Sequence, residues 1–257
     1  MLIAASLLIA ARIFLISGVL DMRIYGFQKL TLLDYPEHLA ALVFTGGCNF
    51  RCPWCHNGAL IRPSSDMPWL DEADVLSQLE RRASMLEGVV ISGGEPTLQP
   101  DLRDFILKCR DMGYKIKLDT NGSHPEVLIA LVEDGLVDYV AMDIKADKEN
   151  YGMVVGLEEI DIESIEKSIR FLIDAGGTVQ RDFHYEFRTT VMPQYHDPAS
   201  IAAIAGWIQG AENYFLQAFR DSDAVPDHSF TEPDSAYMQE LLTAAKALIP
   251  HSAIRGV

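Results

Sequence analysis

Three cysteines stand close together in the stretch Cys48-Asn49-Phe50-Arg51-Cys52-Pro53-Trp54-Cys55, and thiolates are ligands for soft metal ions and iron–sulfur clusters. Spacings of three and two intervening residues let three thiolates on one tight loop surround a cubic [4Fe-4S] cluster. Such clusters usually carry four Cys ligands, so a cluster held by three would keep one iron open for chemistry. Gly46 and Gly47 precede the first thiol, where a backbone without Cβ atoms can approach the inorganic core.

The same stretch permits three other kinds of site. Cys52, Cys55 and His56 match the attachment signature of a c-type haem, and Cys52 with Cys55 alone matches a redox dithiol. Cys48, Cys52, Cys55 and His56 together are a permitted ligand set for zinc. The haem and the dithiol leave Cys48 unused, and the adjacent Cys55 and His56 would have difficulty pointing at one zinc ion. The stretch alone therefore leaves a cluster and these alternatives open.

Size and charge narrow the class of protein. The chain has 257 residues, enough for one α/β domain with a sizeable core. A formal net charge of −16 argues against a nucleic acid or an anionic membrane as partner, because phosphate binding needs a basic patch. Three of the four cysteines share one loop, which indicates a metal site in a reducing compartment rather than a disulfide framework. We therefore expect a cytoplasmic protein.

Residues 1–21 form an apolar tail, distinct from a single expected domain over residues 22–257. The tail is long enough to span a membrane, but it has Arg12 near its centre, where a charge is costly. It lacks the basic start and the clear cleavage site of a signal peptide. A membrane anchor stays open as an alternative, and we prefer either an unplaced tail or a translation start at Met22.

Hydrophobic runs rich in β-branched and aromatic residues predict six strands, at residues 40–44, 88–92, 115–119, 139–144, 186–191 and 213–218. Between them, apolar residues recur at helical spacing, for example over residues 102–112 and 162–173. This alternation predicts parallel strands with right-handed crossovers. Six units are too few for a closed eight-stranded barrel, so the candidate folds are a doubly wound sheet and an open, partial barrel.

Glycines and polar residues gather where the predicted strands end. In chain order they are Gly93, Gly94, Glu95, Pro96, Asp119, Thr120, Asn121, Asp143, Lys145, Arg188 and Gln217. Because the carboxyl ends of parallel strands meet at one edge, we expect these residues and the three cysteines to form one site. Cys109 lies on the apolar face of a predicted helix and is expected in the core, and His56 is expected to pack rather than to react.

These residues resemble the radical S-adenosylmethionine (SAM) superfamily, through the Cys-x3-Cys-x2-Cys loop and the Gly93-Gly94-Glu95-Pro96 segment after the next strand. The runs at residues 27–36 and 43–57 are similar to the anaerobic ribonucleoside-triphosphate reductase activating proteins, which are glycyl-radical enzyme activating enzymes related to pyruvate formate-lyase activating enzyme. The similarity covers about residues 22–217. It implies a partial (β/α)6 TIM-like barrel with mostly parallel strands and the cluster at its open top.

The resemblance also implies roles for the residues. Cys48, Cys52 and Cys55 would each bind one iron of the cluster, and SAM would chelate the fourth. By motif position, residues 93–96 would contact the SAM amino group, chiefly through backbone, and Asp119 and Asn121 would lie near the ribose or carboxylate. Asp143 and Lys145 would lie near the methionyl end of SAM, and Asp119, Thr120 and Asp143 match positions that hold a monovalent cation. Arg188 and Gln217 match the family only loosely.

The implied activity is reductive cleavage of SAM to a 5′-deoxyadenosyl radical, which takes a hydrogen atom from a glycine of the reductase. Flavodoxin or ferredoxin would supply the electron. Two alternatives within the superfamily are activation of another glycyl-radical enzyme, of the pyruvate formate-lyase type, and action on a small molecule, as in deazapurine synthases. A third, from another class, is an electron-transfer or haem-carrying membrane protein anchored by the apolar tail.

Overall fold

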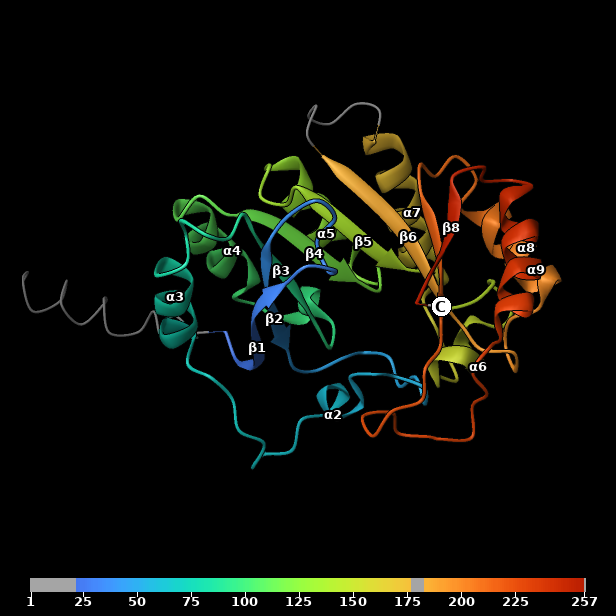
Figure 1. The fold of residues 1–257 in the computed structure, drawn as a ribbon, viewed down its shortest axis with the longest axis horizontal. Coiled ribbons are helices and arrows are strands. Elements are labelled where there is room, and N and C mark those ends of the chain that lie inside the picture. The colour runs from blue at the N-terminus through green and yellow to red at the C-terminus, as the bar shows by residue number, and fades with distance from the viewer. Residues whose placement is uncertain (1–21, 177–182, 257) are drawn as a thin grey trace, which may run out of the picture.

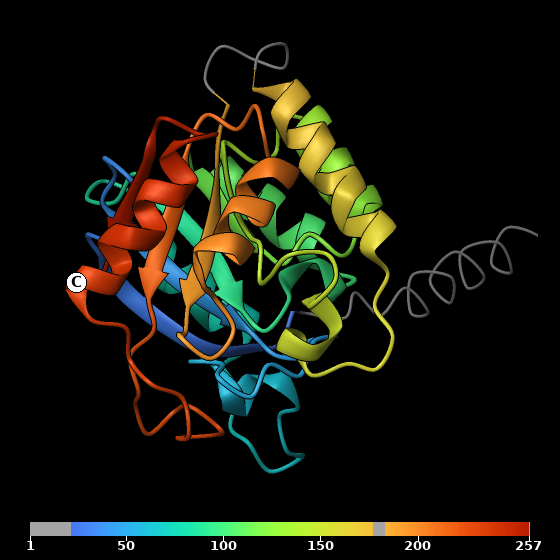
Figure 2. The same ribbon diagram turned by 90° about the vertical axis from the view of Figure 1, so that its right-hand side faces the viewer.

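The computed structural model describes residues 22–176 and 183–256. Eight strands form one sheet in which neighbours in sequence are neighbours in space, in the order β1 to β8. β1 pairs antiparallel with β2, and each later pair is parallel. Helices lie on the outer side of this curved sheet (Figures 1 and 2). A strand order that never reverses excludes the doubly wound fold and identifies an open, partial barrel.

The elements have the following bounds. The strands are β1 (Ile24–Thr31), β2 (Ala40–Thr45), β3 (Gly88–Gly93), β4 (Lys115–Thr120), β5 (Tyr139–Asp143), β6 (His184–Val191), β7 (Tyr214–Ala218) and β8 (Ser252–Arg255). The helices are α2 (Gly58–Ile61), α3 (Glu72–Glu80), the 3-10 helix η1 (Pro96–Leu98), α4 (Leu102–Asp111), α5 (Pro125–Glu133), α6 (Tyr151–Val155), α7 (Ile162–Ala175), α8 (Pro198–Trp207) and α9 (Ser235–Lys246).

The six predicted strands are confirmed as β2 to β7, with ends that differ by at most two residues. The two edge strands, β1 and β8, were not predicted. β1 exposes Gln28, Lys29 and Leu30 in succession, so it lacks the clean apolar alternation of a half-buried strand. β8 has four residues, too few for a pattern to stand out. In the described residues the partial barrel therefore consists of the six predicted strands and one further strand at each edge.

Local sequence explains where the central helices begin and end. α4 follows Asp101, and α5 begins at Pro125, a residue that loses no helical hydrogen bond at that position. Gly113 and Gly135 follow these two helices with φ angles of 89° and 66°, which a residue with a Cβ rarely adopts. On its inner face α4 buries Phe105, Ile106 and Cys109 completely against the sheet.

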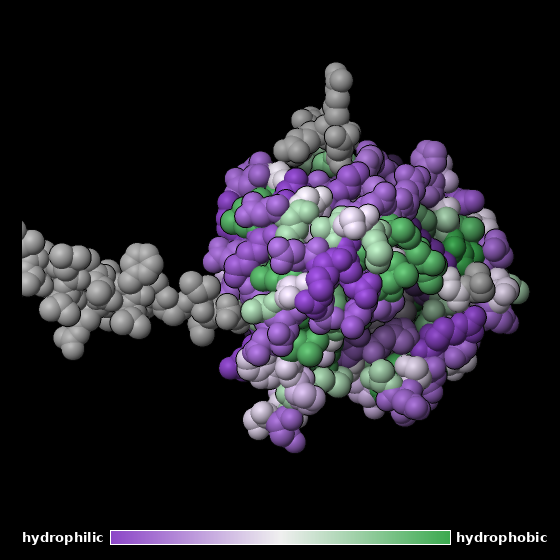
Figure 3. Space-filling model, turned by 60° about the vertical axis from the view of Figure 1, so that its left-hand side comes forward, coloured by the Kyte–Doolittle hydropathy of each residue, from purple (hydrophilic) through white to green (hydrophobic). Residues whose placement is uncertain are grey.

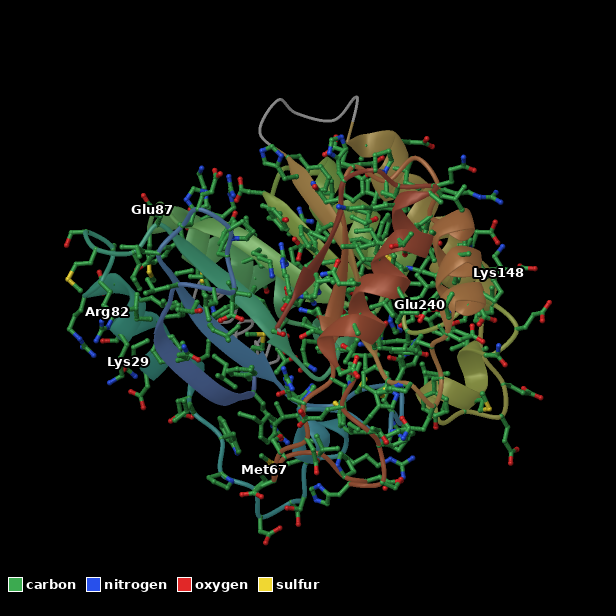
Figure 4. The ribbon with its side chains drawn as sticks, turned by 45° about the vertical axis from the view of Figure 1, so that its right-hand side comes forward. Lys29, Met67, Arg82, Glu87, Lys148 and Glu240 are labelled. Carbon is green, nitrogen blue, oxygen red and sulfur yellow. The ribbon has the colours of Figure 1, made fainter. Side chains whose placement is uncertain are left out.

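The outer surface is mainly polar. Charged side chains such as Glu87 and Lys148 lie at the periphery (Figure 4), and Figure 3 shows a largely hydrophilic face on which an apolar area borders a hollow. Within the part of the chain that the structure describes, no helix is both long and apolar enough to cross a membrane. The apolar tail, residues 1–21, lies outside the described residues, so its start-site and anchor interpretations stay predictions.

Candidate active site at the open end of the barrel

A cavity of about 490 Å³ lies at the carboxyl ends of the strands. Its lining includes Cys48, Cys52 and Cys55, together with Gly93, Gly94, Glu95, Asp119, Thr120, Asn121, Asp143, Lys145, Arg188 and Gln217. Pro96, the first residue of η1, is buried and is not among the lining residues. A cavity of about 930 Å³ lies outside the barrel between α7 and α8, but neither a thiol nor a predicted site residue lines it. Chemistry rather than size therefore marks the candidate site.

The cysteine loop (residues 46–57) is held by backbone hydrogen bonds from both sides. The N–H groups of Gly47 and Cys48 donate to carbonyl oxygens at the end of α2, at 2.8 and 3.1 Å. The Arg51 N–H donates to the Val155 carbonyl oxygen of α6 at 2.8 Å. Figures 1 and 2 both place α2, α6 and the segment 219–234 beside one another at one end of the sheet. The loop is thus fixed to two helices by main-chain hydrogen bonds.

The three thiols suit a polynuclear cluster. They are free, and backbone N–H groups two residues further on donate to the sulfurs of Cys48 and Cys55 at 3.4 and 3.3 Å. Hydrogen bonds to sulfur are one way in which a protein stabilises bound thiolates. Burial raises the pKa of Cys48 to about 11 and that of Cys52 to about 12, and it raises the pKa of Cys55 as well. Without metal these groups stay protonated near neutral pH, so binding of a cluster must release their protons.

The zinc alternative finds no support in the described residues. His56 turns away, and its Nε2 bonds the carbonyl oxygen of Arg220 at 2.7 Å while the ring packs against Phe219. In residues 22–176 and 183–256, no three His, Cys, Asp or Glu side chains are placed to hold a single metal ion. Cys109 is fully buried in the core, as its helical face predicted.

The two glycines after β3 are required by a close approach of two loops. A Cβ at Gly94 would overlap the carbonyl oxygen of Gly47, and Gly93 has a φ of 110°. The approach is fixed by the Gly94 N–H, which donates to Thr45 at 2.9 Å, and by the Glu95 N–H, which donates to Gly47 at 2.8 Å. A plain turn would need neither constraint, so this segment positions backbone against the cysteine loop.

Opposite the cysteines, the strand ends carry a chain of ion pairs. Arg188 Nε lies 2.9 Å from Asp143 Oδ1, and its Nη1 lies 3.5 Å from Asp119 Oδ2. Lys145 Nζ lies 2.8 Å from Asp143 Oδ2, and the buried Lys117 pairs with Asp119. Burial alone would raise the pKa of Asp143, but Arg188 and Lys145 outweigh it and lower that pKa to about 2. Asp143 and its two basic partners, Lys145 and Arg188, are therefore charged at neutral pH.

This charge balance bears on the monovalent cation that the resemblance implied. Asp119 and Asp143 are already compensated by basic side chains, and the Thr120 hydroxyl donates to Glu95 at 2.7 Å. A cation there would have to displace these partners, so the described arrangement does not support it.

Glu95 is the best-satisfied polar side chain of the site. Its Oε1 accepts hydrogen bonds from the Thr97 N–H, the Thr97 hydroxyl and the Thr120 hydroxyl, at 3.1, 2.5 and 2.7 Å. Its Oε2 accepts the Asn121 N–H at 2.7 Å. Burial raises the pKa of Glu95, and these four donors oppose the rise. The carboxylate thus joins the loops that follow β3 and β4 rather than facing the cavity with a free oxygen.

Several contacts of the site are not predicted by the sequence, although Trp54 and Asn57 belong to the run at residues 43–57. Asn57 Nδ2 donates to the Gly93 carbonyl oxygen at 3.1 Å, and Trp54 Nε1 donates to the Val154 carbonyl oxygen of α6 at 3.1 Å. Lys145 Nζ lies over the Trp54 ring, 5.2 Å from its centroid. Lys117, inside β4, was also missed. These contacts join segments that are distant in sequence, so no local pattern announces them.

Residues 42–200 match the radical SAM superfamily. The chain belongs to the radical SAM superfamily. A Methanocaldococcus jannaschii protein, provisionally named a glycyl-radical enzyme activating enzyme, is 33% identical over 247 residues, which are 95% of this chain and 96% of that protein. Pyruvate formate-lyase-activating enzyme of Clostridium pasteurianum is 31% identical over 144 residues, 52% of this chain and 57% of that enzyme. A 7-carboxy-7-deazaguanine synthase of Methanopyrus kandleri is 34% identical over 124 residues, 41% of this chain and 48% of that enzyme.

A solved structure agrees on the fold. Streptococcus suis SuiB bound to S-adenosylmethionine superposes with a TM-score of 0.60 at 12% identity, over 81% of this chain and 48% of SuiB. The protein is thus a radical SAM enzyme, homologous to glycyl-radical enzyme activating enzymes, and its cofactors are a 4Fe–4S cluster and SAM. The cavity fits both, since it combines three free thiols with a rim of backbone and charged groups.

Proposed function

We propose that this enzyme generates a glycyl radical on anaerobic ribonucleoside-triphosphate reductase. The charge balance of the cavity is the observation that favours a protein over an anionic small molecule as substrate. Its two basic lining residues, Lys145 and Arg188, are both paired with Asp143. An anionic small molecule would need a basic group left free, whereas a glycine loop presents neutral backbone. The similarity over nearly the whole length of the Methanocaldococcus protein supports the same choice.

In this proposal Cys48, Cys52 and Cys55 hold three irons of the cluster. The backbone of residues 93–96 and the charged groups of Asp119, Asp143, Lys145 and Arg188 bind and orient SAM. When bound, the cluster and SAM supply the one-electron cleavage that yields a radical able to take a hydrogen atom from glycine. The side chains of Glu95, Thr120 and Asn121 hold the loops in place. Gln217, near the end of β7, also lines the cavity.

The test combines the anaerobically reconstituted protein with SAM, flavodoxin or ferredoxin as electron donor, and the reductase. We expect a glycyl-radical EPR signal on the reductase and 5′-deoxyadenosine in matching amount. Pyruvate formate-lyase serves as the parallel substrate. A signal on pyruvate formate-lyase alone would replace the target, and SAM cleavage with no radical on either protein would favour the deazapurine-synthase type, a small-molecule substrate.

A further inference from the structure

A cyclic set of side-chain hydrogen bonds ties the cysteine loop to the end of β4. Asn121 Nδ2 donates to Asn49 Oδ1 at 2.9 Å, and Asn49 Nδ2 donates to Ser123 Oγ at 2.8 Å. Ser123 Oγ in turn donates to Asn121 Oδ1 at 2.6 Å. Both ends of the Asn49 carboxamide are therefore engaged by residues just beyond β4. We call these three residues the asparagine clamp.

The clamp continues into the loop that follows β3. The Asn121 N–H donates to Glu95 Oε2 at 2.7 Å, and the Glu95 N–H donates to Gly47 at 2.8 Å, which returns the chain of bonds to the cysteine loop. Asn121 is 6% exposed and Glu95 is 1% exposed, so water competes little for these bonds. Three separate loops thus share one connected network, and Asn49 is its member between Cys48 and Cys52.

The position of Asn49 gives the clamp a consequence for ligand binding. A ligand such as SAM binds the cluster at one end and the ends of β4 and β5 at the other. Its affinity therefore depends on the distance between the cysteine loop and these strand ends. Asn49 adjoins one thiol, and Asn121 is two residues from Asp119. Loss of the clamp would leave the three thiols able to bind the cluster, but the position of the cysteine loop relative to the ends of β4 and β5 would no longer be fixed.

We propose that Asn49 and Asn121 are positioning residues that set the cysteine loop at the spacing that SAM bridges, without contacting SAM themselves. This inference rests on the cluster and SAM of the proposed function, not on the identity of the target protein. It reassigns Asn121, which the sequence motif placed beside the SAM ribose or carboxylate.

The test measures the Kd of SAM for the oxidised, cluster-loaded full-length protein by equilibrium dialysis, together with iron and sulfide content. We expect Asn49→Ala and Asn121→Ala each to weaken SAM binding about fivefold to tenfold, the effect of a buried hydrogen bond, with the cluster content unchanged. Because both changes break the same link, the double variant should be no weaker than either single variant. The EPR spectrum of the reduced cluster should respond to SAM only at correspondingly higher concentrations.

Two variants separate positioning from general loosening of the loop. Asn57→Ala removes a different tie of the cysteine loop, to Gly93, so its effect should multiply with that of Asn49→Ala. Asn49→Asp keeps the oxygen that accepts from Asn121 and should bind SAM more tightly than Asn49→Ala. If Asn49→Ala does not fold, Ser123→Ala removes the two clamp bonds of the Ser123 hydroxyl but keeps the bond between Asn121 and Asn49, and it should weaken binding about threefold.

SAM binding by Asn49→Ala as tight as in the wild type would overturn the proposal, as would loss of the cluster in that variant or multiplying effects of Asn49→Ala and Asn121→Ala. Failure of the proposed target is a separate result, since it would show as wild-type SAM binding without a radical on the reductase. A wild-type protein that assembles no cluster would remove both.

Discussion

The four cysteines differ in what surrounds each sulfur atom. Cys48, Cys52 and Cys55 line one cavity, whereas Cys109, on the inner face of α4, is fully enclosed by the core. We expect Cys48→Ala, Cys52→Ala and Cys55→Ala each to abolish reductive SAM cleavage, because three irons need three thiolates. Cys109→Ala should keep full cleavage and lower the free energy of unfolding by about 1–2 kcal/mol, as deletion of a buried atom does. Iron content, 5′-deoxyadenosine formation and urea unfolding measure the three effects.

The same chemical change at four positions provides its own control. Loss of activity in Cys109→Ala, with fold and cluster retained, would contradict the core assignment. The sequence could separate these residues because the roles differ in pattern, a dense thiol spacing against a helical apolar face. It could not reveal that Asn49 is clamped, since its partners Asn121 and Ser123 are more than seventy residues away.

At the scale of elements, α6 contacts and supports the cysteine loop. Trp54 and Arg51 both donate to carbonyl oxygens of this helix, and the helix ends at Gly156, whose φ is 71°. A Cβ at Gly156 would lie 2.5 Å from the Arg51 carbonyl oxygen. We expect Gly156→Ala to displace the cysteine loop and to lower the iron content and the rate of SAM cleavage at least tenfold. Iron analysis and single-turnover assays with dithionite as reductant check this.

Gly113→Ala is the matched control for this prediction. Gly113 also has a positive φ, 89°, but a Cβ there would meet nothing within 4 Å, and it ends α4 far from the cavity. Both changes should cost about 1 kcal/mol of stability from backbone strain. Equal iron content and activity in the two variants would show that the contact with Arg51 has no bearing on the site.

The elements also show how far the sequence could lead. β2, β3 and β5 are mostly buried, so each appears as a nearly continuous apolar run with a recognisable end. β4 differs, since Ile116 and Leu118 alternate with Lys and Asp. That was enough to place the candidate residues at one rim. The edge strands β1 and β8 escaped because one is half exposed and the other is short. α6 supports the cysteine loop, but it has only five residues and, like β8, is too short to be predicted from a pattern.

Over the whole molecule, both ends of the described chain take part in the barrel. β1 and β8 form its two open edges, and the segment after β7 returns to the cysteine loop, where the Asp227 N–H donates to the Pro53 carbonyl oxygen at 3.0 Å. The family resemblance in the sequence weakened after residue 217, yet this later segment covers part of the site. Its function follows from tertiary contact, which no motif encodes.

The start of the described fold gives the last prediction, that a protein beginning at Met22 keeps the structure and activity of the full chain. Met22 is 1% exposed, and its backbone N–H donates to Glu72 Oε2 at 2.7 Å, while the other oxygen of Glu72 pairs with Lys108. In the shortened protein this nitrogen becomes an ammonium group of ordinary pKa about 7.7–8.0, and the carboxylate is already in place to compensate it. We expect an unchanged melting temperature, to within about 2 °C, and unchanged SAM cleavage.

Glu72→Gln tests whether Glu72 compensates the new ammonium group. The substitution should destabilise the shortened protein by about 1 kcal/mol more than the full chain, because only in the shortened protein does it leave a buried charge without its partner. A shortened protein that unfolds or loses its cluster would show instead that residues 1–21 belong to the working enzyme.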